Sequence, residues 1–191
     1  MNTENLLPRM VRAARLNAAF YNEVEADTSL NGQALLVVII AAVASGLGGL
    51  LGGLFGGAGL TAGITALIVG ILLTVLGYYI WAYLTLLIGT RLFGGTADLG
   101  EMLRVIGYAN TPNVLGFFSF IPILGGLIAL VGSLWALVAG VIAVREALDF
   151  DTGKALLTVL IGWLVVFIIS FLIGTLLGAA GLGLGALTGG G

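Results

Sequence analysis

The sequence contains no cysteine and no histidine. These absences exclude disulfides, thiolate zinc sites, histidine-ligated haem and any step with a cysteine nucleophile or a histidine base. Charge is scarce too: 7 Lys and Arg plus 9 Asp and Glu make up 8% of 191 residues, where a soluble domain carries roughly a quarter. No basic region is present to hold a nucleic acid. The composition therefore excludes a soluble globule and a nucleic-acid-binding protein.

Apolar residues and glycine make up most of the chain. Hydrophobic residues account for 60%, and there are 32 glycines but only 3 prolines. The mean hydropathy is +1.19. This composition is typical of an all-α, polytopic membrane protein whose helices approach one another closely.

The charged residues lie in three short clusters, at 4–27, 91–104 and 145–154. The stretches between and after these clusters are uncharged. A membrane-spanning helix needs about 20 apolar residues, so the first two stretches have room for two helices each and the last has room for one. The sequence predicts five transmembrane helices, at 31–55, 62–89, 99–118, 123–146 and 154–178.

The positions of the clusters also predict an orientation. Two helices per uncharged stretch return the chain to the side it left, so all three clusters share one side. The positive-inside rule makes that side cytoplasmic. We therefore expect a cytoplasmic N-terminus and an outer C-terminus, with an N-terminal segment at 1–28, a five-span domain at 29–178 and a Gly-rich C-terminal tail at 179–191.

Residues 6–26 combine basic and apolar side chains at helical spacing. Arg9, Arg12 and Arg15 are three residues apart and share one flank of a helix. This pattern predicts an N-terminal amphipathic helix that lies in the membrane interface, with its arginines against anionic lipid head groups. A solvated helix leading into the first span is the alternative.

Glycines recur at four-residue spacing near the end of the first predicted span. Gly48, Gly52 and Gly56 lie on one helix face, where a neighbouring backbone can approach closely. We interpret them as helix-packing positions. The alternative is a partly unwound outer loop, since glycine is a poor helix former.

The third predicted span contains a polar, proline-bearing interruption. Tyr108, Asn110, Pro112 and Asn113 lie within six residues. Proline removes a backbone hydrogen bond, so the helix should kink or break here, with the polar side chains bonding the freed backbone groups. Broken helices mark binding sites in some transporters, and a simple packing kink is the alternative.

The charged clusters supply a candidate cytoplasmic interaction face. The alternative is local: Asp98 and Glu101 have capping-box spacing, Glu101 and Arg104 can pair, and Asp151 can cap the fifth span. No charged residue lies mid-span, which argues against a proton relay or a voltage sensor. We predict no catalytic, metal or cofactor site. The candidate face consists of Arg9, Arg12, Arg15, Asp98, Glu101, Arg104, Arg145, Asp149, Asp151 and Lys154.

The stretch from Phe93 to Pro112 resembles the central signature of the Yip1 domain family. It joins a Gly-Gly turn, a short amphipathic helix start, Gly-Tyr-Ala and a proline. Residues 23–27, 143–148 and 152–155 resemble prokaryotic members, and the likeness covers roughly 20–175. It implies a polytopic membrane protein with a cytoplasmic N-terminal segment, in a prokaryotic plasma membrane. Eukaryotic relatives act in vesicle trafficking with Rab-type GTPases, but this chain lacks their Asp-Leu-Tyr-Gly-Pro motif.

Two functions are consistent with these patterns. The first is a non-enzymatic scaffold, accessory subunit or membrane organiser that uses its cytoplasmic face and its Gly-lined helices. Its partners would be the lipid bilayer and other membrane subunits or further copies of the chain. The alternative is a channel or carrier for a small neutral solute that uses the broken third span near 110–112.

Overall fold

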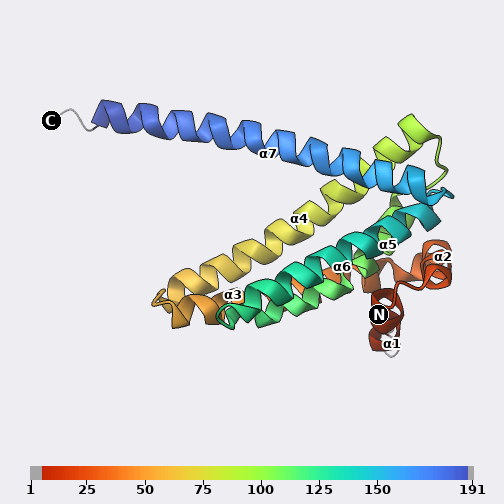
Figure 1. Cartoon of the computed structure of the whole chain (residues 1–191), viewed down its shortest axis with the longest axis horizontal. Coiled ribbons are helices and arrows are strands. Elements are labelled where there is room, and N and C mark those ends of the chain that lie inside the picture. Colours follow the sequence, from red (N-terminus) through yellow and green to blue (C-terminus); the bar gives the residue numbers. More distant parts are fainter. Residues whose placement is uncertain (1–5, 189–191) are drawn as a thin grey trace.

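A computed structural model describes residues 6–188, and every element in that range is a helix (Figure 1). Side chains are described up to residue 169, and at 171, 172 and 175 beyond it. In chain order the elements are α1 (Leu6–Ala14), α2 (Ala18–Ala26), the 3₁₀-helix η1 (Thr28–Leu30), α3 (Asn31–Phe55), α4 (Leu60–Phe93), α5 (Leu99–Ala109), the 3₁₀-helix η2 (Thr111–Phe120), α6 (Leu124–Ala147) and α7 (Thr152–Thr188).

Four helices in the described range are long and apolar enough to cross a membrane. They run over Thr28–Phe55, Leu60–Phe93, Leu124–Ala147 and Thr152–Ile169. The chain is therefore an integral membrane protein. Four of the five predicted spans correspond to these helices, and the count of five stays a prediction, because the third predicted span is divided between α5 and η2.

The segment η2 lies between α3 and α6, alongside both (Figure 1). Glycines allow this close approach. A Cβ on Gly48 of α3 would collide with the carbonyl oxygens of Gly116 and Phe117, and one on Gly125 of α6 would collide with those of η2. A Cβ on Gly132 would lie 3.0 Å from the Pro112 carbonyl oxygen. Backbone therefore packs directly on backbone along η2.

The core lies at the end of the bundle that carries the charged clusters. Phe20 and Tyr21 of α2 are buried against Met102 and Tyr108 of α5, together with Val144 of α6. The rings of Phe20 and Tyr108 meet edge to face at 5.2 Å between centroids. The N-terminal segment thus belongs to the core of the fold.

The structure corrects the single helix predicted for residues 6–26, whereas the position of this segment in the membrane interface stays a prediction. The segment forms two helices rather than one, and the chain turns between them where Leu16 adopts a left-handed φ of 58°. Met10 and Phe20 face protein instead of lipid, because α1 and α2 pack against α5, η2 and α6. The pattern of apolar residues was that of an amphipathic segment, but it could not specify what covers the apolar side.

The longest helix, α7, diverges from this packed group, whereas α4 packs along α3 and places Tyr78 and Ala82 in the core. α4 and α7 lie together near Trp81 and Gly162, and from there the outer part of α7 projects away from the bundle (Figure 1). α7 continues as a helix to Thr188, beyond the predicted end of the span at 178 and into the predicted tail. Trp163 and Phe167 on its surface are exposed.

Candidate functional site

The interruption of the third predicted span is built from short polar side chains. α5 ends at Ala109 and η2 begins at Thr111, with Pro112 in the first turn of η2. The Asn110 Nδ2 group donates to the Ile106 carbonyl at 2.9 Å, and the Thr111 hydroxyl donates to the Tyr108 carbonyl at 2.7 Å. These bonds satisfy carbonyls near the end of α5, as a helix end in an apolar medium requires.

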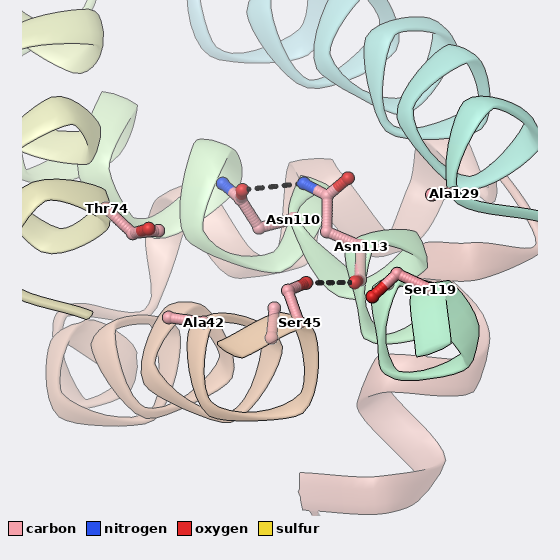
Figure 2. Close-up of a pocket in the computed structure, with 9 residues that line it drawn as sticks. Ala42, Ser45, Thr74, Asn110, Asn113, Ser119 and Ala129 are labelled. Carbon is pink, nitrogen blue, oxygen red and sulfur yellow. Dashed lines mark hydrogen bonds between the residues drawn. The ribbon is translucent and has the colours of Figure 1, made fainter. Parts of the chain in front are cut away.

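A second layer of hydrogen bonds ties the break to α3. The Asn113 Nδ2 group donates to Asn110 Oδ1 at 3.0 Å, and the Ser45 hydroxyl of α3 donates to the Asn113 carbonyl at 3.0 Å (Figure 2). In Figure 2 the side-chain oxygen of Asn113 points away from Asn110. Within the described residues this oxygen accepts no hydrogen bond, so it is available to a ligand or a water molecule.

A cavity of about 320 Å³ lies beside the break, between α3, α4, η2 and α6. Its walls combine small apolar residues with hydroxyl and amide groups, and no charged side chain lines it. The lining consists of Ala41, Ala42, Ser45, Thr74, Asn110, Asn113, Gly116, Ser119 and Ala129 (Figure 2). Such a lining suits a neutral molecule that donates and accepts hydrogen bonds.

Asn113 also lines a second cavity, of about 370 Å³, between α4, α6 and α7. Its walls are mostly apolar and include the rings of Trp81 and Trp163. The break predicted from the sequence therefore has a cavity on each side. Tyr108, predicted with it, instead faces the core, where its hydroxyl donates to Gln33 Oε1 at 2.9 Å.

The structure removes Arg104 from the candidate interaction face. This side chain is only 3% exposed. Its guanidinium donates to the backbone carbonyls of Val24 and Glu25 and, at 3.1 Å, to Asn31 Oδ1. The expected pairing with Glu101 is absent, because the Arg104 side chain turns inward to the end of α2. Arg104 is an internal anchor, and a partner cannot reach it.

Several other charged residues of that face are engaged in local structure. Asp98 and Glu101 form a reciprocal capping box at the start of α5, with both hydrogen bonds at 2.8 Å. The Asp151 carboxylate accepts from the Lys154 amide at 3.0 Å at the start of α7, and Arg145 pairs with Glu146. These contacts follow the capping alternative that the spacing suggested.

The remaining members of the face differ in exposure. Arg9 donates to Gln33 Oε1 at 2.8 Å, and Arg12 pairs with Glu23 at 2.7 Å. The Asp149 carboxylate accepts from the Thr96 hydroxyl at 3.0 Å, and the Lys154 ammonium lies 5.6 Å from the Phe150 ring centroid. Arg15, Asp149, Asp151 and Lys154 remain exposed.

Glu25 is not among the site residues predicted from the sequence, although its pKa is the most perturbed among the carboxyls at this end of the fold. Burial, followed by the negative charges of Asp149, Glu101 and Glu146, raises the pKa of Glu25 to about 7. Burial also raises the pKa of Tyr21 in the neighbouring turn. No sequence signal identifies Glu25, because its neighbours come from segments more than 70 residues away.

The three glycines predicted as packing positions have different surroundings. Gly48 and Gly52 face η2, where a Cβ on Gly52 would lie 3.4 Å from the Phe120 Cα. Gly56 instead ends α3 and contacts only its own last turn. The packing strip is therefore shorter than predicted, because the helix stops at Phe55.

Within residues 6–188, no group of three or more carboxylates is arranged to hold a metal ion.

The comparisons with known proteins give one match. The family model described as Yip1 domain matches residues 15–184. No curated protein and no solved structure matches the chain.

Proposed function

The chain belongs to the Yip1 domain family, and from this premise we propose that it is a non-enzymatic scaffold or accessory subunit that associates with other membrane-spanning chains. The association runs through the helices that the fold itself leaves uncovered. In the proposed orientation, the charged end of the bundle lies in the cytoplasm. The C-terminal end of α7 lies on the outer side of a prokaryotic plasma membrane. The proposed organisation keeps a cytoplasmic segment at 1–28 and a membrane domain at 29–178.

The proposal includes five crossings of the bilayer, with α5 and η2 together forming the third. α5 has 11 residues and η2 has 10. At rises of 1.5 and 2.0 Å per residue their combined length is roughly 36 Å, against a hydrocarbon thickness of about 30 Å. The first turns of α5 lie at the charged end beside α2, so the crossing uses the last turn of α5 together with η2. The pair also runs parallel to α3, from Ala34 beside Gly107 to Gly52 beside Phe120. The longer 3₁₀ rise lets a short segment reach the depth of a full span.

One observation carries the lateral association: two glycines of α4 face open space. A Cβ at Gly70 or Gly77 would meet no atom within 4 Å. Each glycine in a helix interior costs roughly 1 kcal/mol relative to alanine. At Gly48 the close approach of η2 accounts for the glycine, whereas no contact within the described part of the chain does so at Gly70 and Gly77. Since seven residues are close to two helical turns, both lie on one face of α4, as a crossing helix requires.

The surroundings of these glycines are apolar and exposed. Leu72, Leu73 and Leu76 are all more than half exposed. α7 presents a comparable surface at Leu164 and Phe167. Lipid can cover these side chains, but lipid gives no reason for bare backbone at Gly70 and Gly77. A second helix covers both the leucines and the glycines.

In-membrane cross-linking tests this proposal directly, because the natural chain has no cysteine to interfere. Leu73→Cys places one thiol on the face between Gly70 and Gly77. Oxidation in native membranes should yield a cross-linked product of twice the mass for a second copy. A reagent that links two cysteines should join Leu73→Cys to a cysteine of another subunit when that subunit is the neighbour. The cross-linked product then has a different mass, and mass spectrometry identifies the second subunit. An exclusively monomeric chain under both treatments contradicts the proposal.

Bulky substitutions provide the matched test. A Gly70→Leu and Gly77→Leu double variant should abolish cross-linking at Leu73→Cys by blocking the approach of a helix. Gly126→Leu is the control, since Gly126 also faces open space, but on α6. Cross-linking should persist in this control. Equal cross-linking in both variants would place the contact elsewhere.

A second candidate function is passage of a small neutral solute through the broken segment. The observation that favours it is the cavity of about 320 Å³ beside Asn110 and Asn113, which no charged side chain lines. Amide and hydroxyl groups inside the membrane-spanning bundle offer a solute hydrogen bonds that replace those it makes with water.

Flux measurements in proteoliposomes test this candidate with glycerol and urea as probe solutes. The Asn110→Leu and Asn113→Leu double variant should lose flux, while Ser133→Ala, on the α6 wall of the second cavity, should retain it. Equal flux in the natural protein and the double variant excludes the solute pathway without affecting the scaffold proposal.

A further inference from the structure

The two N-terminal helices form a strap over the cytoplasmic end of the bundle, defined here as residues 6–26. The strap packs on α5, η2 and α6, and polar contacts hold it at separate points. The Trp135 indole of α6 donates to the Ala14 carbonyl at 2.8 Å. Arg104 of α5 donates to the carbonyls of Val24 and Glu25 at the other end.

At that second point one carboxylate oxygen has no partner. Glu25 Oε2 is the buried side-chain oxygen of the described residues that no hydrogen bond satisfies. Arg104 contacts the backbone of Glu25 but directs its N–H groups to carbonyls and Asn31 rather than to this carboxylate. An ionised carboxylate at this place therefore lacks the donors that normally stabilise buried negative charge.

The charges around Glu25 are mostly negative. α5 contributes Glu101 and Arg104, α6 contributes Glu146, and the following loop contributes Asp149. Of the nearby cations, Arg145 pairs with Glu146, and Arg12 of α1 pairs with Glu23. Among the residues that the structure describes, Arg104 is thus the single cation that favours the ionised form of Glu25, against three carboxylates.

We infer that the strap is a pH-sensitive latch. Protonated Glu25 holds the strap closed over α5 and α6, and ionisation of Glu25 loosens it. Release uncovers the apolar side chains beneath it, including Met102 and Val105. The latch therefore determines whether this part of the cytoplasmic end is sealed or open to the membrane interface and to other proteins.

The direction of the pH effect follows from the two states of the strap. In the closed state the pKa of Glu25 is raised from 4.5 to about 7, with burial as the largest cause. In a released strap the carboxyl returns to its ordinary value. Protons bind more tightly to the closed state, so closure weakens as pH rises between these two values and changes little above them. Because the carboxyl lies at the edge of the fold, solvent screening reduces the effect to about tenfold in the closing equilibrium.

Spin-label distance measurements on the full chain in nanodiscs test the latch. Labels at Asn22→Cys on the strap and Leu156→Cys on α7 occupy exposed positions, and no natural cysteine competes. Between pH 5.5 and 8.5 the longer, broader distance population should rise about tenfold relative to the closed one. A distribution that does not change with pH overturns the inference.

Matched variants separate the latch from a general effect of pH. Glu25→Gln keeps the shape of the protonated form, so the strap should stay closed throughout the range, whereas Glu23→Gln on the same helix should keep the pH response. Asp149→Asn removes one repelling charge, tolerates the left-handed φ of 54° at this position, and should shift the transition to lower pH. A pH response that persists in Glu25→Gln, or is unshifted in Asp149→Asn, overturns the inference.

Discussion

The packed group, made of α1, α2, α3, α5, η2 and α6, contrasts with the exposed faces of α4 and α7, although the other side of α4 packs on α3 and α5. Within the most apolar part of α3, 33% of the residues are buried, but none are buried in the corresponding part of α4. Both helices are apolar, and their single charge, Arg91, lies in the last turn of α4, so composition does not explain the contrast. Hydrophobicity brings a helix into the bilayer, whereas glycine contacts and polar bonds decide which helices pack together.

The largest expected effect on stability comes from making the same substitution, glycine to leucine, in each of the two regions. Gly48→Leu forces a side chain into the carbonyls of η2 and should lower the free energy of unfolding by about 3 kcal/mol. Gly70→Leu in α4 should change it by about 0.5 kcal/mol or less, since nothing lies within 4 Å. SDS titration of the protein in detergent micelles measures both. Equal losses would show that the contrast between the regions is not energetic.

Removal of the buried guanidinium tests how firmly the packed group holds its N-terminal part. Arg104→Met should lower the free energy of unfolding by about 2 kcal/mol, because the carbonyls of Val24 and Glu25 lose their donors. Proteolysis of the strap should accelerate with it. Arg15→Met, at an exposed position, is the control and should behave like the natural protein. Indistinguishable variants would argue that Arg104 is not an anchor.

Removal of helix caps should give a smaller difference in stability between the two regions. Asp98→Ala removes the capping box of α5, within the packed group, and should lower the free energy of unfolding by about 1 kcal/mol. Asp151→Ala removes the corresponding bond at the start of α7 and should have a smaller effect, because α7 contributes fewer contacts to the fold. Unfolding in SDS compares the two, and a larger effect from Asp151→Ala would reverse the contrast.

The smallest effect concerns two tryptophans. Trp135→Phe removes the hydrogen bond to the Ala14 carbonyl, which links α6 to the strap, and should lower the free energy of unfolding by about 0.5 kcal/mol. Trp163→Phe on α7 should have no measurable effect, since 64% of that side chain is exposed. Thermal melting followed by circular dichroism checks both. A measurable effect at Trp163 alone would show that α7 is better packed than the contrast implies.

Local signals in the sequence predicted local structure well. The Asp98–Glu101 spacing predicted a capping box, and the structure contains it. The polar residues around Pro112 predicted an interruption, and α5 ends at Ala109. Both depend on interactions within a few residues, which sequence spacing directly encodes.

Signals that depend on distant neighbours were less informative. Arg104 looked like a surface residue, because its acceptors lie near Val24 and Glu25, 80 residues earlier. The apolar positions of α1 and α2 looked lipid-facing, since a helical pattern shows that one side is apolar but not what covers it. Gly56 had the correct spacing, but the helix ended before it could pack there.

The sequence by itself determined that this is a helical membrane protein of the Yip1 domain family, with charged residues confined to three clusters. These properties follow from composition and local spacing, since a bilayer excludes charge and unpaired backbone. Only the tertiary structure decided that the strap belongs to the core, that Arg104 is internal, and that Gly48 packs while Gly70 remains open. Each depends on which distant segments meet, because burial and hydrogen bonding are properties of pairs of surfaces rather than of single residues.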